Sequence, residues 1–232
     1  MKSLEQLASE EKTYLPGGVV QKEMSHVPLV CVVGGVGVGK NYLMHLTNLP
    51  IVGTMTSRPK RESDDPSVYS YYTNEEFDAM IVRQELVQYA VDLPNDAMYG
   101  STLKNYVIDM PNLADVWHWS VVELPEKGFK SVRAVSIITP VKQWQEQLKS
   151  RFADRDENYR IARLAEAKKS LSWSKEQIIA RNPTHTVIIN DKASTVDSIR
   201  KLIDFAYENE VAIPDNALGL IDDMLNFLEY AN

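Results

Sequence analysis

A glycine-rich stretch that ends in a lysine carries the clearest chemical signal in the chain. Gly34, Gly39 and Lys40 fit the spacing G-x-x-x-x-G-K of a phosphate-binding loop. Glycine lets the backbone wrap tightly enough for successive N–H groups to face one anion, and the lysine adds a full positive charge. An ordinary glycine-rich turn is the alternative. The apolar run 29–33 before the loop favours phosphate binding over this alternative. The residues expected to bind the phosphates are Gly35, Val36, Gly37, Val38, Gly39, Lys40 and Asn41.

The residue after the lysine departs from this pattern. The motif has Ser or Thr there, whose hydroxyl binds Mg²⁺, whereas this chain has Asn41. An amide oxygen can still reach a metal ion, directly or through water. Asn41 is therefore the candidate Mg²⁺ ligand.

Two groups of arginines offer further cationic sites. Arg58 and Arg61 lie in a stretch with a proline, and each guanidinium can donate paired hydrogen bonds to a phosphate. Each group could instead be a solvated, charged surface. The second group recurs near an expected loop between helices, which suits a mobile cationic lid: Arg151, Arg155, Arg160 and Arg163.

The hydrophobic pattern predicts strands that alternate with helices. Expected strands cover 28–33, 51–54, 85–91, 116–123, 131–139 and 184–190. Expected helices cover 4–12, 141–152, 161–171, 193–207 and 217–228, with two more that begin near Thr73 and Thr102. We expect the helix after Thr102 to end near Met110, and the helix 217–228 to pack on the core. This alternation predicts an α/β fold with a mostly parallel sheet and a ligand site at the carboxyl ends of its strands.

Composition narrows the class of protein. The 232 residues are 44% hydrophobic and 25% charged, which is ordinary for a soluble chain. A net charge of −7 argues against a nucleic-acid polymer as partner, but not against nucleotides. The one cysteine, Cys31, is expected to be a small buried hydrophobe, and it allows no internal disulfide. With no apolar signal core and no membrane-length apolar run, we expect a cytoplasmic protein without membrane contact.

Between about residues 27 and 205 the motifs together resemble the guanylate kinase family. The stretch 54–61 is similar to the family's S-x-T-T-R-x-P-R, and 69–77 to its D-Y-x-F-x-x-x-x-F. The stretch 85–90 looks like E-F-x-E-x-A, 99–101 matches Y-Y-G-S/T, and 188–191 looks like the family's V-N-D. No single motif after the loop is specific, but the ordered set is.

The resemblance implies a P-loop parallel sheet flanked by helices, with a small nucleoside-monophosphate-binding lobe at about 55–105 and a helical lid at about 151–162. Residues 1–27 would be an N-terminal extension, 28–205 the kinase-like domain, and 206–232 a C-terminal helical extension. A monomer or a homodimer is expected.

The implied reaction is phosphoryl transfer from ATP to a nucleoside monophosphate with Mg²⁺. In that reaction Lys40, Arg151 and Arg163 would be catalytic, and Asn190 would lie near the adenine of ATP. The second substrate would bind through two sets of residues. Its phosphate would contact Arg58, Arg61, Tyr69 and Tyr99, and its base would face Thr54, Gln88 and Ser101.

Two further departures from the family pattern concern the substrate. Gln88 stands where the family has Glu, and an amide offers one acceptor and one donor where guanine N1–H and N2–H need two acceptors. The family's acidic strand end, D-x-D, has no clear match, and Glu123 is the nearest carboxylate. His118, in the expected strand 116–123, is interpreted as structural rather than catalytic.

Three functions therefore remain open. The first is a kinase for GMP or dGMP, which the retained Lys40 and the arginines favour. The second is a kinase of the same fold for another base, which Gln88 favours. The third is a catalytically silent, guanylate-kinase-like binding module, which Asn41 and the missing acidic strand end favour.

Overall fold

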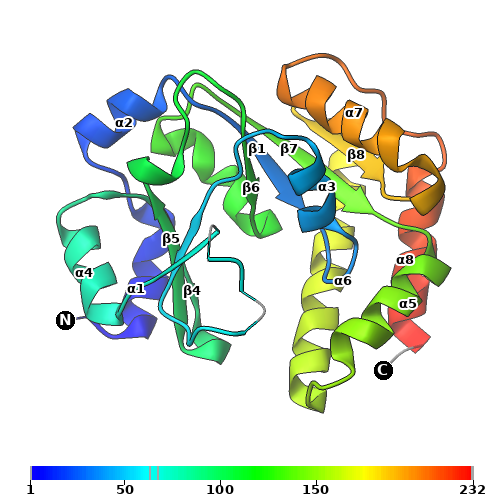
Figure 1. Cartoon of the computed structure of the whole chain (residues 1–232), viewed down its shortest axis with the longest axis horizontal. Coiled ribbons are helices and arrows are strands. Elements are labelled where there is room, and N and C mark those ends of the chain that lie inside the picture. Colours follow the sequence, from blue (N-terminus) through cyan, green and yellow to red (C-terminus); the bar gives the residue numbers. More distant parts are fainter. Residues whose placement is uncertain (1, 63, 67, 231–232) are drawn as a thin grey trace. The chain divides into compact units, whose positions relative to one another are not determined.

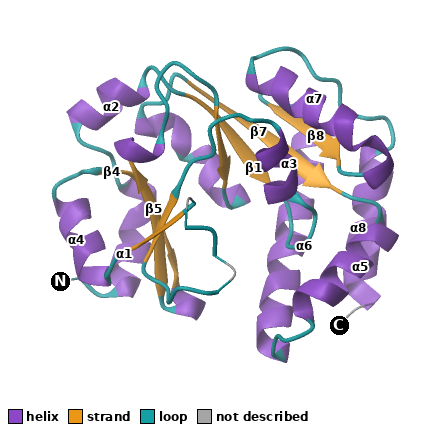
Figure 2. Ribbon diagram, viewed as in Figure 1, coloured by secondary structure: helices purple, strands orange, loops and turns teal. Residues whose placement is uncertain are grey.

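A computed structural model describes residues 2–62, 64–66 and 68–230 (Figures 1 and 2). The chain divides into two compact units. The first unit comprises Met1–Leu29, Pro50–Asn112 and Val122–Val132, and the second unit comprises Val30–Leu49, Leu113–Val121 and Arg133–Asn232.

The second unit is built on a four-stranded sheet with the order β6-β1-β7-β8. Its strands are β1 (Pro28–Val33), β6 (Asn112–Asp115), β7 (Ser131–Ile138) and β8 (His185–Ile189). Every residue of β1 after Pro28 is buried, which explains its continuous apolar sequence. The predicted α/β fold with a parallel sheet flanked by helices is confirmed.

The helices of this unit fall into two groups (Figure 1). The first group, α3 (Lys40–Leu46) and α7 (Thr195–Ala206), packs together. In the second group, α8 (Ala217–Tyr230) packs on α5 (Val141–Phe152) and α6 (Glu157–Ile179). The side chains of Ile221, Met224 and Leu228 are buried, so the predicted packing of the last helix on the core is confirmed. A short 3₁₀ helix, Lys192–Ser194, precedes α7.

The first unit contains a second four-stranded sheet with the order β3-β2-β5-β4. Its strands are β2 (Thr54–Thr56), β3 (Tyr69–Tyr71), β4 (Leu86–Asp92) and β5 (Ala97–Thr102). Strands β2 and β3 are parallel, and the other pairs are antiparallel. Helix α4 (Asn74–Val82) starts near Thr73, as the sequence predicts; a capping box at Thr73 forms its first turn, and Phe77 is buried at 0% exposure.

The N-terminal segment of the chain covers the outer edge of β4. It contains α1 (Leu4–Glu10), a 3₁₀ turn (Glu11–Thr13) and α2 (Gly18–Met24). The Tyr14 hydroxyl donates to the carbonyl of Leu86 over 2.8 Å, and the backbone N–H of Val91 donates to Glu11 Oε2 over 2.9 Å. These contacts satisfy backbone groups that an open edge strand would expose. The segment is therefore an integral part of the first unit.

Three predicted elements are wrong. The strand expected at 51–54 begins three residues later, as β2 (Thr54–Thr56). Ile51 forms only an isolated bridge. The helix expected after Thr102 is a 3₁₀ turn, Leu103–Asn105, since Ser101 and Thr102 pair with β4 and finish β5 instead. Further short 3₁₀ helices are Leu93–Asn95, His118–Val122 and Leu124–Lys127.

The strand expected at 116–123 is the third error. The strand is β6, which ends at Asp115, and a 3₁₀ helix covers most of the predicted segment. The backbone N–H of Val116 still donates to the carbonyl of Val32, but β1 ends one residue later at Val33 and leaves no partner strand beyond it. Stacking of Trp117 on Trp119, at a centroid distance of 5.1 Å, stabilises the turn instead.

None of the helices within the described ranges has both the length and the apolar composition needed to cross a bilayer.

Candidate functional site

The glycine-rich loop of the second unit joins β1 to α3 and rests on two buried side chains. Asn190 Nδ2 donates to the carbonyl of Val38 over 2.8 Å, and Trp144 Nε1 donates to the carbonyl of Val36 over 2.8 Å. Asn190 is 3% exposed and Trp144 is fully buried. These bonds fix two carbonyls of the loop, so the protein itself sets the path of the loop.

Three glycines of the loop, including Gly34 with φ = 153°, adopt backbone conformations that other residues avoid. Gly37 has φ = 79° and Gly39 has φ = 89°. A Cβ on Gly39 would lie 2.1 Å from Asn190 Nδ2, which is far inside van der Waals contact. The tight wrap that the sequence predicts for a phosphate-binding loop therefore needs glycine at this position.

The Lys40 side chain folds back over the loop. Its Nζ donates to the carbonyl of Gly34 at 2.5 Å and to that of Gly35 at 3.4 Å. Only 14% of the side chain is exposed. The ammonium group is thus held beside the backbone that would cradle a phosphate, and it can neutralise part of the phosphate charge.

Asp115 is the carboxylate that the sequence analysis missed. It ends β6 in the second unit, and its Oδ1 lies 3.6 Å from Lys40 Nζ. Desolvation by the surrounding protein raises the pKa of Asp115, although 45% of its side chain is exposed, and the Lys40 charge opposes this rise. The acidic strand end sought at Glu123 therefore occurs here. Glu123 itself lies in the first unit, where its charge acts on Glu11 and Lys127.

Oxygen atoms suited to Mg²⁺ lie near this loop. Asn41 is exposed in the first turn of α3, and the Asp115 carboxylate lies beside Lys40. Within the described ranges, no cluster of three His, Cys, Asp or Glu residues could hold a metal ion by itself. Mg²⁺ in nucleotide sites is commonly bound by one or two protein oxygens together with substrate phosphates and water. The donors present fit such a nucleotide-borne Mg²⁺.

The expected lid region contains a cluster around one tyrosine. The guanidinium carbons of Arg155 and Arg163 lie 5.3 and 5.4 Å from the centroid of the Tyr159 ring. Arg163 also donates to Glu166 Oε2 at 2.6 Å. Desolvation lowers the pKa of Arg163, but attraction to Glu166 more than offsets this, so the pKa is raised and the side chain stays cationic. Arg151 lies exposed near the end of α5.

The predicted phosphate-binding arginines of the first unit lie beside β2. Arg58 is 6% exposed, and its guanidinium carbon lies 4.9 Å from the centroid of the Tyr69 ring. It forms a paired ion bridge with Asp64, and Asp64 also accepts from the backbone N–H of Arg61 at 2.8 Å. The Asp64 carboxylate thus holds the guanidinium of Arg58 and the backbone of Arg61 in this loop.

Three residues expected to face a base form one row across the sheet of the first unit. Gln88 on β4 lies opposite Ser101 on β5. Met55 on β2 pairs with Gly100 on β5, so the antiparallel register sets Thr54 beside Ser101. Ser101 therefore lies between Thr54 and Gln88, because β5 is between β2 and β4. The Ser101 hydroxyl lies 2.8 Å from the Tyr106 hydroxyl. Tyr99, two residues before Ser101, pairs with Ala90.

Comparison with known proteins supports this combination of fold and motifs. No family model matches the chain. The chain is 26% identical to a guanylate kinase of Mycoplasmoides gallisepticum over 186 residues, which are 75% of this chain and 91% of that protein. Its fold is similar to that of guanylate kinase from Anaplasma phagocytophilum, with a TM-score of 0.52 and 19% identity over 78% of this chain and 85% of the other. Together these matches support the guanylate kinase family for the chain.

Two of the three departures from the guanylate kinase pattern persist in the structure. Asn41 replaces the hydroxyl residue after Lys40, and Gln88 lies in the row with Ser101. The third departure is only partly resolved, because Asp115 supplies one carboxylate at a strand end beside Lys40, whereas Trp117 stands where D-x-D has its second acid. A short apolar run that ends in an acid is the sequence signal that could have located Asp115. The stronger signal of the Val and Trp residues that follow obscures it.

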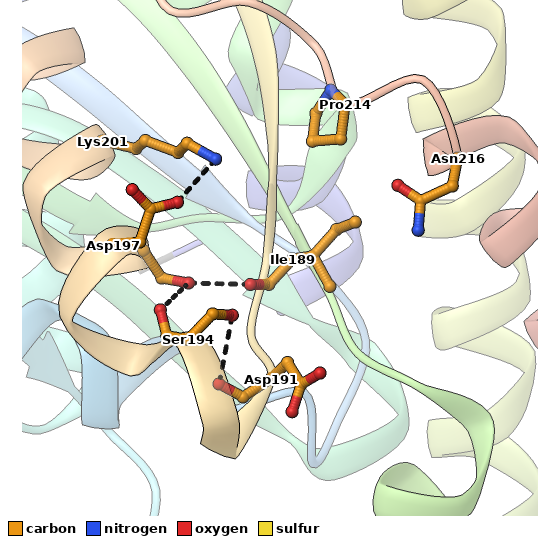
Figure 3. Close-up of a pocket in the computed structure, with 8 residues that line it drawn as sticks. Ile189, Asp191, Ser194, Asp197, Lys201, Pro214 and Asn216 are labelled. Atoms are coloured by element: carbon orange, nitrogen blue, oxygen red, sulfur yellow. Dashed lines mark hydrogen bonds and ion pairs between the residues drawn. The ribbon is translucent and has the colours of Figure 1, made fainter.

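A pocket of about 310 Å³ lies in the second unit beyond the end of β8 (Figure 3). Its lining carboxylates are engaged in protein contacts. Asp197 pairs with Lys201 at 2.7 Å, and Asp191 accepts from the backbone N–H of Ala193 at 3.0 Å. Ser198 donates to the carbonyl of Ile189 at 2.8 Å. These polar groups stabilise the start of α7.

The conformation of Gly39 should make this position intolerant of any larger residue. Replacing Gly39 by alanine should lower the free energy of unfolding by about 2 kcal/mol, because φ = 89° strains an L residue and the new Cβ displaces the Asn190 amide from Val38. The same variant should bind ATP at least about tenfold more weakly, since the loop backbone shifts. Urea unfolding and ATP calorimetry measure the two effects.

Gly219→Ala is the matched control. Gly219 lies in α8, and a Cβ built there has no heavy atom within 4 Å. Alanine in a helix is favoured over glycine by about 1 kcal/mol, so this variant should be as stable as the parent or more stable. Equal stability of the Gly39→Ala variant and the parent protein would contradict the loop geometry.

Proposed function

We propose that the chain transfers the γ-phosphoryl group of ATP to a nucleoside monophosphate, with GMP or dGMP as the acceptor. The observation that carries this proposal is the Lys40 ammonium, held over the glycine-rich loop within 3.6 Å of the Asp115 carboxylate. The names of the two similar proteins, both guanylate kinases, support the choice of acceptor.

The donor nucleotide binds to the second unit in this mechanism. Backbone N–H groups of the loop and Lys40 bind the ATP phosphates, and Mg²⁺ held by Asp115 and Asn41 would neutralise part of their charge. Asn190, buried beneath the loop, keeps the loop in place through its bond to Val38, and it would lie near the adenine of bound ATP. Phosphoryl transfer needs chiefly positioning and positive charge around the moving group.

The acceptor nucleotide binds to the first unit. Its phosphate contacts Arg58, Arg61, Tyr69 and Tyr99, and its base faces the row of Thr54, Gln88 and Ser101. Arg151 and Arg163 stabilise the charge on the transferring group and help to exclude water, which would otherwise accept it. Such cationic contacts accelerate transfer because negative charge is spread over the oxygens of that group in the transition state.

A second acceptor class is supported by one observation. Gln88 lies opposite Ser101 in the row, where its amide presents a donor beside an acceptor. Adenine, cytosine and pyrimidine imides each present the complementary pair. A kinase for one of these monophosphates is therefore the alternative function.

The test is ADP release from MgATP with a panel of ribo- and deoxynucleoside monophosphates. Turnover chiefly on GMP or dGMP is the expected result. Preferred turnover on another base would make Gln88 the determinant of specificity and support the alternative. A folded protein that binds ATP but turns over no monophosphate would overturn the kinase proposal in favour of a binding module.

A further inference from the structure

Four hydrogen bonds converge on one buried carboxylate in the first unit. Arg58 donates from Nη1 to Asp64 Oδ2 at 2.7 Å and from Nη2 to Oδ1 at 2.8 Å. Asp64 Oδ2 also accepts from the backbone N–H of Arg61 at 2.8 Å and from the Tyr71 hydroxyl at 2.5 Å. The side chains of Arg58 and Asp64 are only 6% and 7% exposed. This network therefore fixes the position of Arg58 within its loop.

Both partners of this ion pair stay charged near neutral pH. The hydrogen bonds from Arg58 lower the pKa of Asp64 well below its usual range, although desolvation opposes them. In return, Asp64 raises the pKa of Arg58. The paired geometry is the strong form of a charge-assisted hydrogen bond and orients the planar guanidinium as well as binding it.

Asp64 binds only one edge of the Arg58 guanidinium, the edge formed by Nη1 and Nη2. A second edge of the group remains available to a ligand. Asp64 takes one hydrogen from each terminal nitrogen, and the carbonyl of Pro59 accepts from Nη1 at 3.0 Å. Among the described residues, the hydrogen bonds of this side chain use Nη1 and Nη2 and none uses Nε. Arginine has five N–H donors in a fixed plane, so Nε–H and the second Nη2 hydrogen remain as a parallel pair. That pair matches two oxygens of a phosphate.

We propose that Asp64 is a positioning residue, which orients Arg58 so that its Nε–Nη2 edge receives the phosphate of the acceptor nucleotide. This proposal rests on the proposed function. Asp64 does not touch the substrate in this scheme. It acts by removing the rotational freedom of Arg58 before binding, so the acceptor loses less conformational entropy on binding. Tyr71 and the Arg61 backbone hold the carboxylate in turn.

The opposite role, a carboxylate that competes with phosphate, predicts the reverse result. A competing carboxylate would leave Arg58 when phosphate binds, and removing it would strengthen acceptor binding. Asp64 binds the Nη1–Nη2 edge of Arg58, so it does not have to leave when phosphate binds the Nε–Nη2 edge. This geometry favours the positioning role. The sign of the change in acceptor KM separates these two roles.

The test compares Asp64→Asn with the parent protein in steady-state kinetics and in calorimetry of the acceptor monophosphate. The asparagine amide turns one acceptor into a donor that faces an Arg58 nitrogen, so the guanidinium loses its fixed orientation. The acceptor KM and Kd should rise by about tenfold or more, the cost of losing one charge-assisted pair. The kcat and the KM for ATP should stay within about twofold of the parent values, because the donor site is unchanged.

Glu62→Gln is the matched control, since Glu62 is exposed, lies two residues away and loses the same charge. Its acceptor KM should not change. An acceptor KM that falls in Asp64→Asn, or that stays the same in the folded variant, overturns the positioning role. Parent protein that neither binds nor phosphorylates any monophosphate overturns the proposed function itself, which distinguishes the two failures.

Tyr71→Phe keeps the test decisive if Asp64→Asn does not fold. It removes only the hydroxyl that bonds Asp64 and leaves the Asp64–Arg58 charges paired. The acceptor KM should rise by about two- to fivefold, as expected for one hydrogen bond to a charged group, with kcat unchanged. An unchanged acceptor KM in this variant would overturn the proposal.

Discussion

Replacing Lys40 by methionine should lower kcat by about a thousandfold, which corresponds to about 4 kcal/mol of transition-state stabilisation. Methionine has a similar length and fills similar space, but it carries no charge and donates no hydrogen bond. The variant loses the ammonium bonds to the carbonyls of Gly34 and Gly35, which lie in a loop that Asn190 and Trp144 also hold. The fold should therefore persist while turnover collapses. ADP release with the best monophosphate of the panel measures the effect.

A control must separate the loss of this ammonium from the loss of any positive charge. Lys168→Met removes a lysine from the same unit, at a position where 49% of the side chain is exposed and pairs with Glu229 at 3.5 Å. Exposed pairs contribute little, so its turnover should match that of the parent. Normal turnover of a folded Lys40→Met variant would remove the glycine-rich loop from the mechanism.

The elements with strong local signals were predicted from the sequence. The strand β1 and the helix α5 have the predicted bounds, 28–33 and 141–152. The predicted start of α4 near Thr73 is also confirmed, and the structure shows that Thr73 caps the helix through a capping box with Glu76. Each of these signals lies within a few residues along the chain, so tertiary contacts do not override it.

The region after β6 shows where local signals fail. Val116, Trp117, Val121 and Val122 all favour a strand by propensity, yet β1 ends at Val33 and offers these residues no partner strand. The real strand, Asn112–Asp115, has only four residues, and its short run carries a weak periodic signal. This weak signal hides Asp115, because the sequence pattern places the end of the strand at Glu123 instead.

Asp64 was missed for a different reason. The stretch 62–66 is recognisable as a turn, but the sequence does not show that the turn returns a carboxylate to Arg58, six residues earlier, and to the Tyr71 hydroxyl. The row of Thr54, Ser101 and Gln88 likewise depends on the pairing of three strands. Motif similarity gave the residues of this row, whereas only the register of the sheet brings them side by side.

The second large effect is expected for Gln88→Glu, which should raise the preference for guanine over other bases by about a hundredfold in kcat/KM. Gln88 lies on the edge strand β4 directly opposite Ser101, in a half-buried position. A carboxylate there accepts from both N1–H and N2–H of guanine, whereas the amide directs its NH₂ at one of these donors. A buried donor that faces another donor costs about 1–3 kcal/mol. The panel of monophosphates, run on both proteins, gives the ratio.

Gln84→Glu is the control for this prediction, because it makes the same chemical change at an exposed position of the same unit. It should leave the ranking of the bases unchanged, as added negative charge alone acts on every monophosphate alike. If Gln88→Glu also leaves the ranking unchanged, Gln88 does not contact the base, and specificity must come from other residues of the row. If guanine preference rises only in Gln88→Glu, the hydrogen-bonding pattern of this one side chain sets how strongly guanine is selected over the other bases.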